Sequence, residues 1–363
     1  MTDLDFMTLA LQLAKSTKGQ TSPNPLVGAV LVKDHQIVGL GASLKAEDPH
    51  AGIIAIQMAG AKARNATLYI TLEPSVDYGR SLSCIDMIIS SQIDRIVIAT
   101  LNPDPKHKGE GVKSLKIAGL KVDIGVLKEK ADEVNKVFFH FIKLGMPYVT
   151  LKAAMTMDGK AATIAGDQLV PCEDTRLDIH QYRHEHDAVV TGVNTILRND
   201  PYLTTRLPLG GKNPIRIVLD TNLRTPLDAK VINDHCVDTW IVVSRYAPTD
   251  KVLSMKSKNV EIIQLAEEKI NIVSLLKLLG KKGISSLFVE GGPQILGSFM
   301  QSKVVNEIVT YISPKIVCGA NAPTSIGGEG IGMMNNAIQQ KIKSIEQIGE
   351  DIKIVSSPIW DHE

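Results

Sequence analysis

The chain has 363 residues, of which 44% are hydrophobic, and its charged residues balance to a net charge of +1 at pH 7. This length favours two domains, and the balanced charge gives no electrostatic reason to expect binding to nucleic acid or to a membrane surface. No apolar run approaches the ~20 residues of a membrane span, and the acidic start MTDLDFMTLA lacks the layout of a signal peptide.

Four scattered cysteines, without any CxxC pair, suit a reducing compartment and provide no disulfide framework. We therefore expect a cytoplasmic protein whose partner is a small molecule, and not a nucleic acid or a membrane. The cysteines are Cys84, Cys172, Cys236 and Cys318.

The first part of the chain alternates strand patterns with helix patterns. A first helix runs from Asp3 to near Gly19, and later helices are predicted at 51–63, from Ser81 or Ser83 onward, and near 112–118. Strands are predicted at 26–32, 36–40, 67–72, 95–100 and 121–124. This alternation predicts a layered α/β domain, which we expect to cover residues 1–145.

The stretch from Pro49 to Cys84 keeps the frame of a zinc deaminase. Such a site needs H-x-E at the start of one helix, and P-C followed by a second cysteine at the next. Here His50 and Cys84 remain, but Gly52 stands at the glutamate position and Ser75 at the first cysteine position. A serine hydroxyl is a poor zinc ligand, and glycine cannot carry a proton.

We therefore predict a deaminase-shaped domain that has lost zinc and deaminase chemistry, with the remaining histidine and cysteine as leftover side chains. A residual two-ligand metal site is the alternative. As substitutes for the missing base, Glu47, Asp48 or Glu73 would each come from a different direction.

The second part of the chain also mixes strands and helices. Residues 129–143 are predicted to form one amphipathic helix, and the boundary to a second domain, 146–363, falls at Gly145-Met146-Pro147. Further helices are predicted at 173–186 and 293–299. The predicted strands are 148–154, 188–191, 215–220, 239–243, 260–264, 287–290 and 351–355.

Two features of this part indicate a binding site. Lys152 lies within an apolar strand, where an ammonium group is costly unless it is paired or used, although an edge residue with a snorkelling stem is the alternative. Gly291 and Gly292 separate a strand from a helix that begins at Pro293. This arrangement presents free backbone N–H groups, which suit a phosphate, but a glycine pair alone is weak evidence.

Taken together, the motifs resemble the bifunctional riboflavin-biosynthesis deaminase/reductase family over essentially the whole chain. They are SPNPLVGAVLV, the PHA…LEPS…YGR…C frame, NPDP…GEG, YVTLKAAMTMDGK, FVEGG and SPKIVCG…AP, in the order and spacing of that family. The resemblance implies an N-terminal cytidine-deaminase-like α/β/α domain and a C-terminal dihydrofolate-reductase-like α/β domain. It also implies a homo-oligomer, which the sequence itself does not show.

The resemblance further implies which residues form the reductase site. Lys152 and Glu290 are expected to be catalytic, and the cofactor is expected to be NADPH. The cofactor-binding residues would be Thr195, Asn199, Gly291 and Gly292, and the substrate-binding residues Arg183, Leu203 and Arg206. Asn24 and Arg80 match substrate contacts of the family's deaminase domain.

Several positions depart from the family pattern. In the first domain, Ser43 and Asp77 stand where the family has histidines. In the second domain, an aspartate implicated in the reductase site is replaced by Asn199. In the loop after Met157-Asp158-Gly159-Lys160, Leu169 stands at the family's tryptophan position, and Pro171 and Cys172 stand at its hydroxyl positions.

These departures leave several readings open. The favoured one is reduction of 5-amino-6-(5-phosphoribosylamino)uracil to its ribityl compound, with the deaminase activity lost. The second is a non-catalytic or repurposed paralogue that binds a pathway metabolite or an active homologue. The others are a full bifunctional deaminase/reductase with unusual zinc ligands and a reductase with a changed substrate.

Overall fold

The computed structural model describes residues 1–45, 48–75, 83–256 and 260–360. Glu47, Asp77 and Arg80, which were considered above, lie outside these residues. The chain divides into two compact units, Met1–Gly145 and Met146–Glu363. Each unit has its own sheet and its own hydrophobic core.

The first unit contains a five-stranded sheet in the order β2-β1-β3-β4-β5. Strand β1 is antiparallel to both of its neighbours, whereas β3, β4 and β5 run parallel. The strands are β1 (Gly28–Lys33), β2 (Gln36–Ala42), β3 (Thr67–Leu72), β4 (Arg95–Thr100) and β5 (Lys121–Ile124).

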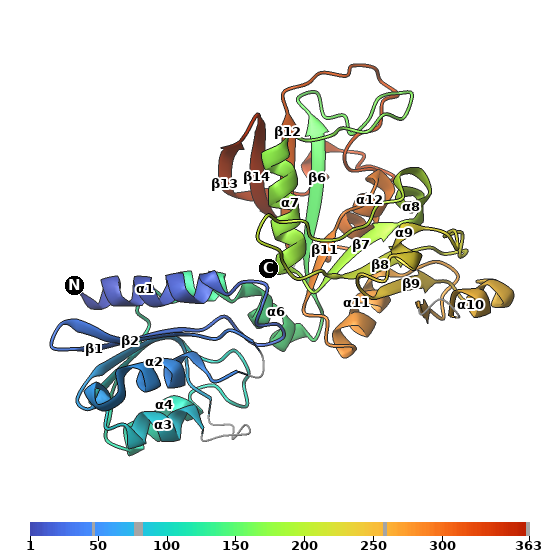
Figure 1. The fold of residues 1–363 in the computed structure, drawn as a ribbon. Helices are drawn as coiled ribbons and strands as arrows, with labels where there is room; N and C mark the ends of the chain where they lie inside the picture. The colour runs from blue at the N-terminus through green and yellow to red at the C-terminus, as the bar shows by residue number, and fades with distance from the viewer. Residues whose placement is uncertain (46–47, 76–82, 257–259, 361–363) are drawn as a thin grey trace. The chain divides into compact units, whose positions relative to one another are not determined.

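Helices cover both faces of this sheet, as Figure 1 shows with α1 on one side and α2, α3 and α4 on the other. The result is the predicted α/β/α layering. The helices are α1 (Asp3–Ser16), α2 (Ala51–Ala59), the 3-10 turn η1 (Gly60–Ala63), α3 (Cys84–Ser90), α4 (Glu110–Ile117), α5 (Lys128–Val134) and α6 (Lys136–Leu144).

Glycines allow helices of the first unit to approach the sheet at backbone distance. A Cβ atom on Gly28 of β1 would lie 1.9 Å from the carbonyl oxygen of Ala10 in α1. A Cβ atom on Gly41 of β2 would lie 2.1 Å from the carbonyl oxygen of Ala51 in α2. Because the obstacle is backbone in both cases, no side-chain rearrangement could make room.

The prediction of one helix over 129–143 is wrong, because the helix breaks at Asn135. This side chain, only 2% exposed, accepts a hydrogen bond from Leu26 N (2.8 Å) and donates one to Leu26 O (2.9 Å). The buried amide thus fixes the loop before β1, and the apolar periodicity of the sequence continues across the break without revealing it.

The second unit contains a nine-stranded sheet in the order β10-β9-β8-β7-β11-β6-β12-β14-β13. The strands from β10 to β12 are parallel, and β14 and β13 add an antiparallel edge. The strands are β6 (Tyr148–Thr156), β7 (Ala188–Gly192), β8 (Ile215–Leu219), β9 (Thr239–Val243), β10 (Glu261–Gln264), β11 (Ser286–Val289), β12 (Glu307–Ser313), β13 (Gln340–Ile348) and β14 (Asp351–Pro358).

Helix α7 packs on one face of this sheet, and α11 and α12 pack on the other (Figure 1). The sequence predicted α7 and α12 but missed α8 to α11 and the edge strand β13. Strand β13 is exposed over almost its whole length, so its sequence lacks the alternation of apolar and polar residues that predicts a half-buried strand. The helices are α7 (Glu173–Glu185), α8 (Val193–Asn199), α9 (Lys230–Asn233), α10 (Thr249–Lys256), α11 (Ile272–Lys281), α12 (Pro293–Gln301) and the 3-10 turn η2 (Met334–Asn336).

Among the helices in the described ranges, none has the length and apolar character needed to cross a membrane.

Candidate active site

The parallel strands β6, β7 and β11 lead to a cavity of about 400 Å³ in the second unit. Ligands of α/β sheets bind at this end of the strands, where loops and helix N-termini converge. Arg206 is not among the residues that line the cavity. Of the residues predicted from the sequence, the lining includes Lys152, Arg183, Thr195, Asn199, Leu203, Glu290, Gly291 and Gly292.

A buried ion pair lies in the wall of this cavity. Arg183 of α7 donates from Nε to Glu290 Oε1 (2.6 Å) and from Nη2 to Glu290 Oε2 (2.8 Å), and the two side chains are only 11% and 10% exposed. Burial raises the pKa of Glu290, but Arg183 and then Lys152 outweigh burial and hold it below its ordinary value. Glu290 is therefore a carboxylate and not a proton donor at neutral pH.

Lys152 faces the cavity from the middle of β6, where it is half-buried. Burial lowers the pKa of its ammonium group, Glu290 opposes this shift, and Arg183 adds to it. Within the described residues, its Nζ atom has no hydrogen bond or ion pair at ordinary distances. An amine with a lowered pKa and no fixed partner is suited to transfer a proton to a bound ligand.

Two further basic side chains lie beside Arg183. Burial, followed by Arg183 and Arg206, lowers the pKa of His180 to about 4, so this imidazole is neutral near pH 7. Burial and then Arg183 lower the pKa of Arg206, whose Nη1 atom donates to Thr204 Oγ1 at 3.2 Å. The predicted phosphate-binding role of Arg183 stays a prediction, because Glu290 already occupies two of its donor groups.

The loop Gly291-Gly292 leads from β11 into α12, and Gly292 caps this helix without a side chain. A Cβ atom on Gly291 would lie 2.7 Å from Ile295, whereas one on Gly292 would meet nothing within 4 Å. Pro293 has no N–H group, and Ile295 N and Leu296 N donate to Gly292 O at 3.0 and 3.2 Å. Among the described residues, the backbone N–H groups of Gly291, Gly292 and Gln294 have no such acceptor, and they suit a phosphate group.

A second cavity of about 360 Å³ adjoins the first and shares Asn194, Thr195, Gly292 and Gln294 with it. Its outer wall contains Arg224, whose Nη2 atom donates to Asn194 Oδ1 at 2.9 Å. The two cavities meet at Gly292, and the second one contains Arg224. This arrangement suits an elongated dinucleotide that carries an additional phosphate group.

The loop after β6 contributes differently from what its sequence suggested. Leu169 lines the first cavity, but Pro171 and Cys172 do not. Instead, the backbone N–H of Cys172 donates to Asp351 Oδ2 at 3.0 Å at the start of α7. Asn199 Nδ2 donates to Gln168 Oε1 at 2.8 Å, so this amide connects α8 to the same loop.

Sequence reasoning missed Asn194 and Arg198 because it did not predict α8, to which both belong. It also missed Gln294, although the helix that contains this residue, α12, was predicted. The usable signal was a second strand–glycine–helix unit at Gly192, which resembles the unit that was recognised at Gly291-Gly292.

The first unit contains a separate cavity of about 310 Å³. Its wall includes three of the positions in the deaminase frame, His50, Ser75 and Cys84, together with Asn24 and Ser43. The remaining described lining residues are Pro25, Val27, Lys45, Asp48, Ile70, Leu72, Glu73, Pro74, Asn102 and Phe138.

The remaining metal-ligand types in this cavity are poorly suited to a metal. Cys84 is only 4% exposed, and burial raises the pKa of its thiol to about 12. His50 caps α2 through its backbone and is exposed. A Cβ atom on Gly52 would lie 3.2 Å from Cys84 Sγ, so the glycine leaves the thiol packed against apolar side chains.

Glu73, the one buried carboxylate in this wall, is engaged elsewhere. Oε2 accepts hydrogen bonds from the backbone N–H groups of Asn102 (3.0 Å) and Gly109 (3.0 Å), and Oε1 accepts one from Val112 (3.1 Å). Glu73 thereby stabilises the N-terminus of α4. It does not replace the missing general base, and Asp48 is the remaining described candidate.

Zinc in a deaminase needs one histidine and two thiolates around a water molecule. In the part of the chain that the structure describes, no group of three or more histidine, cysteine, aspartate or glutamate side chains could hold a metal ion. Ser75 supplies a hydroxyl where the frame needs a thiolate, and Gly52 supplies no carboxylate where it needs a general base. The residues of this cavity therefore do not fit a catalytic zinc.

Comparison with known families assigns both units. The RibD C-terminal domain matches residues 147–354. The cytidine and deoxycytidylate deaminase zinc-binding region matches residues 1–100, a range that includes His50, Gly52, Ser75 and Cys84. These matches confirm the predicted fold class, with a cytidine-deaminase-like unit followed by a dihydrofolate-reductase-like unit.

Individual relatives match over almost the whole chain. The riboflavin biosynthesis protein RibD of Bacillus amyloliquefaciens is 41% identical over 354 residues, which cover 97% of this chain and 95% of the relative. The RibD of Aquifex aeolicus is 43% identical over 353 residues, which cover 97% of each chain.

Solved structures agree with these matches. Acinetobacter baumannii RibD superposes with a TM-score of 0.89 at 31% identity, covering 99% of both chains. The diaminohydroxyphosphoribosylaminopyrimidine deaminase/5-amino-6-(5-phosphoribosylamino)uracil reductase of Thermotoga maritima gives a TM-score of 0.88 at 30% identity, covering 98% of this chain and 99% of that one.

Proposed function

The chain belongs to the riboflavin biosynthesis protein RibD family, and on this premise we propose that its second unit reduces 5-amino-6-(5-phosphoribosylamino)uracil with NADPH. The observation that carries the proposal is one cavity that combines Lys152, the Arg183–Glu290 ion pair and the Gly291-Gly292 loop. The same cavity thus offers a proton donor, fixed charge and a place for a phosphate.

NADPH, when bound, would supply the hydride. Its phosphates suit the Gly291-Gly292 loop and the start of α12, and Thr195 and Asn199 also line this cavity. Arg224 in the adjoining cavity suits the 2′-phosphate that distinguishes NADPH from NADH, because a guanidinium group can bind a phosphate with two parallel hydrogen bonds.

The protein's own part is to open the sugar and hold charge. As the bond between C1 and the ring oxygen breaks, Lys152 Nζ would give a proton to that oxygen and take back the proton that the exocyclic nitrogen loses as the C=N bond forms. The same ammonium group would then protonate this nitrogen when C1 is reduced to the ribityl chain, and solvent would restore the proton on Lys152. Glu290 stays charged and keeps positive charge favourable at Lys152.

On the substrate side, Leu203 supplies an apolar wall, and Arg183 and Arg206 supply positive charge for the substrate phosphate. Charge-assisted hydrogen bonds from arginine suit that phosphate. This assignment rests on the family resemblance and on the closeness of Arg206 to Arg183.

The test is to follow NADPH absorbance with the purified protein and the ribosylaminouracil phosphate. Substrate-dependent oxidation is the expected result. No oxidation, together with no NADPH binding in a fluorescence titration, would contradict the proposal and favour a non-catalytic paralogue. Binding without oxidation would point to a changed substrate, which related ribosylamino-pyrimidines would then identify.

We further propose that the first unit no longer deaminates. Support comes from Gly52 and Ser75 at two chemical positions and from the engagement of Glu73 with the N-terminus of α4. The deaminated substrate must then come from a hydrolytic deamination carried out by another protein.

This second proposal is tested by metal content and ammonia release. Plasma mass spectrometry of the purified protein should find no stoichiometric zinc, and the diaminohydroxyphosphoribosylaminopyrimidine should release no ammonia. About one zinc per chain, together with ammonia release, would instead establish a bifunctional enzyme with unusual ligands.

A further inference from the structure

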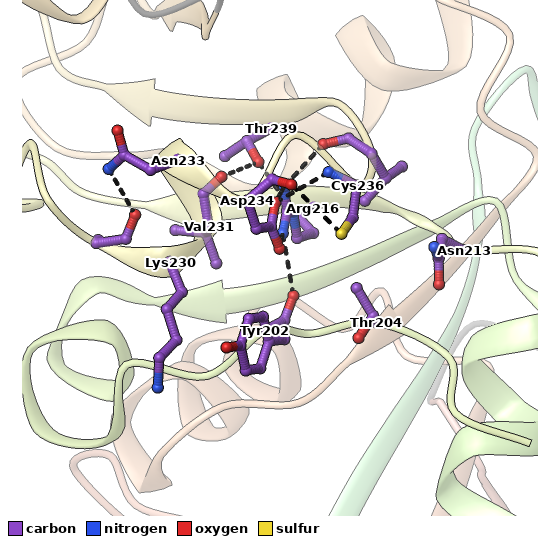
Figure 2. A network of polar contacts seen from close by, with 12 residues as sticks. Tyr202, Thr204, Asn213, Arg216, Lys230, Val231, Asn233, Asp234, Cys236 and Thr239 are labelled. Carbon is purple, nitrogen blue, oxygen red and sulfur yellow. Dashed lines mark hydrogen bonds and ion pairs between the residues drawn. The ribbon is translucent and has the colours of Figure 1, made fainter.

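Arg216 of β8 lies outside the candidate active site, yet it is one of the largest fully buried side chains, at 1% exposure. Figure 2 shows it at the centre of a polar network. Nε donates to Thr239 Oγ1 (2.9 Å), Nη1 to Asp234 Oδ2 (2.6 Å) and Tyr202 O (3.2 Å), and Nη2 to Asp234 Oδ1 (2.7 Å) and Val237 O (2.8 Å). Every one of the five N–H groups of a guanidinium is thus used.

One of these acceptors belongs to the cavity wall. Tyr202 lies between Pro201 and Leu203, which both line the first cavity. Its ring also lies under the ammonium group of Lys230, 5.0 Å from the ring centroid. Arg216 and Lys230 therefore hold this part of the wall with side chains that do not themselves line the cavity.

The same wall has a backbone that needs holding. Asp200 has a φ of 39° and Leu203 a φ of 54°, in the left-handed region that non-glycine residues rarely occupy. Asp200 is fixed by Lys230 N, which donates to its Oδ1 atom at 2.8 Å. The side chain of Leu203 is 3% exposed.

The opposite end of the wall is fixed by the active-site ion pair. Arg183 Nη1 donates to Thr204 O at 3.0 Å while the rest of its guanidinium holds Glu290. The segment 201–204 is therefore held at two carbonyl groups, Tyr202 O by Arg216 and Thr204 O by Arg183, and each arginine is also paired with a carboxylate. A shift at Tyr202 would be transmitted over two residues to Arg183.

We infer that Arg216, with Asp234, is a positioning residue for the substrate wall, which sets both Leu203 and the Arg183–Glu290 pair. The inference rests on the proposed function for its substrate. It does not extend to the cofactor side, because Thr195, Gly291 and Gly292 belong to other segments.

The decisive variant is Arg216→Lys, which keeps the charge but cannot form the five bonds. We expect kcat/KM for the ribosylaminouracil phosphate to fall about 10- to 100-fold, mainly through KM. The dissociation constant for NADPH should stay within about twofold, because the cofactor cavity is untouched. Hydrogen exchange of the Tyr202–Thr204 amides should become faster, and that of Gly291 and Gly292 should not.

The matched control is Arg95→Lys in the first unit. Arg95 also binds two carboxylates, with Nη2 2.7 Å from Asp3 and Nε 2.7 Å from Asp123, and it lines neither reductase cavity. This variant should lower the melting temperature without changing KM. If Arg216→Lys behaves in the same way, with unchanged kinetics and unchanged exchange at 202–204, Arg216 is only structural and the inference is wrong.

A second variant and a readout that is independent of turnover keep the inference testable. If Arg216→Lys does not fold, Thr239→Val removes the acceptor of Nε, together with the hydrogen bond from Thr239 Oγ1 to Val231 O (2.6 Å), and should give a smaller change of the same kind. If the wild-type protein does not turn over, the proposed function fails, but hydrogen exchange at 202–204 still decides whether Arg216 holds the wall.

Discussion

The two cavities of this protein differ in the fate of their ionisable groups. In the second unit, Glu290 keeps its charge because Arg183 lies 2.6 Å away, and Lys152 faces the cavity without a fixed partner. In the first unit, Cys84 is buried with no cation beside it among the described residues, and Glu73 accepts hydrogen bonds from three backbone N–H groups. The second-unit cavity presents an amine and a buried ion pair to a ligand, whereas the first-unit cavity lacks two of the residue types that a deaminase zinc site needs.

The difference teaches that a fold and its chemistry are held by different residues. The core of the first unit packs α2, α3 and α4 against the sheet through aliphatic side chains, and neither Gly52 nor Ser75 contributes a large apolar group to it. Replacing a glutamate and a cysteine there leaves the layers intact. In the second unit, by contrast, the reactive groups are themselves part of the buried polar structure.

The largest expected effect comes from removing the free amine. Lys152→Met should lower kcat/KM about 100- to 10,000-fold, because no other described group is placed to give the proton. The folded protein should not lose stability, since a half-buried charge is replaced by an apolar chain of similar length. Steady-state kinetics and thermal unfolding measure the two effects.

The control is Lys281→Met on the exposed end of α11, which should change neither quantity. Full activity of Lys152→Met would remove the chemical contrast between the two cavities.

The next effect concerns the ion pair. Glu290→Gln leaves Arg183 as an unpaired buried charge and should lower the free energy of unfolding by about 3–5 kcal/mol. Because the folded-state pKa of Glu290 lies below its ordinary value of 4.5, the stability it contributes is complete above that pH and is lost as the pH falls through the folded-state pKa. Urea unfolding at several pH values should show this loss in the wild type and not in Glu290→Gln.

The difference between the two cavities can also be tested by restoring a zinc ligand to the first unit. Ser75→Cys would place a second thiol beside His50 and Cys84 in the same cavity. We expect this variant to bind about one zinc per chain, whereas the wild type binds none. Ammonia release should stay absent, because Gly52 still provides no general base. Zinc binding by the wild type, or no zinc binding by the variant, would contradict the proposal that Ser75 prevents zinc binding in the first unit.

A smaller effect is expected at the outer cavity of the second unit. Arg224→Ala should weaken NADPH binding about tenfold, the value of one charge-assisted phosphate contact, and leave NADH binding unchanged. Asn194→Ala removes the acceptor that orients Arg224 while keeping the guanidinium, and it should show a weaker form of the same selectivity change, although Asn194 itself lines both cavities. Equal weakening for both nucleotides would place the 2′-phosphate elsewhere.

The smallest effect should come from His50. Since its side chain is exposed and makes no capping hydrogen bond, His50→Ala should change the free energy of unfolding by less than about 0.5 kcal/mol. A chelator should also leave the unfolding curve unchanged. A large loss of stability would mean that this imidazole still holds a metal.

Much of the architecture could be predicted from the sequence, because buried strands such as 67–72 and 95–100 carry continuous apolar runs. The break at Asn135 could not, since it depends on a side-chain amide binding the distant backbone of Leu26. Strand β13 escaped because it lies at an exposed edge. Local pattern reports burial, and it does not report contacts that join remote segments.

The candidate site shows the same limit. Lys152 was found because a lysine in an apolar strand is conspicuous, and the glycine pair because it interrupts one. The pairing of Arg183 with Glu290 joins residues that are 107 positions apart, and the support of Tyr202 by Arg216 acts through a carbonyl group that every residue has. A pattern of side chains in the sequence therefore cannot predict that Arg216 donates to this backbone carbonyl group.

The close contacts of Gly28 and Gly41 have a consequence for how the first unit can change over time. Any side chain at Gly28 or Gly41 would meet the backbone of a helix, whereas a Cβ atom on Gly52 would meet only side chains, the nearest being Cys84 Sγ at 3.2 Å. Substitution is therefore more restricted at these two packing positions than at Gly52 in the deaminase frame. The shape of the first unit depends on its packing glycines and not on the residue types that a deaminase reaction needs.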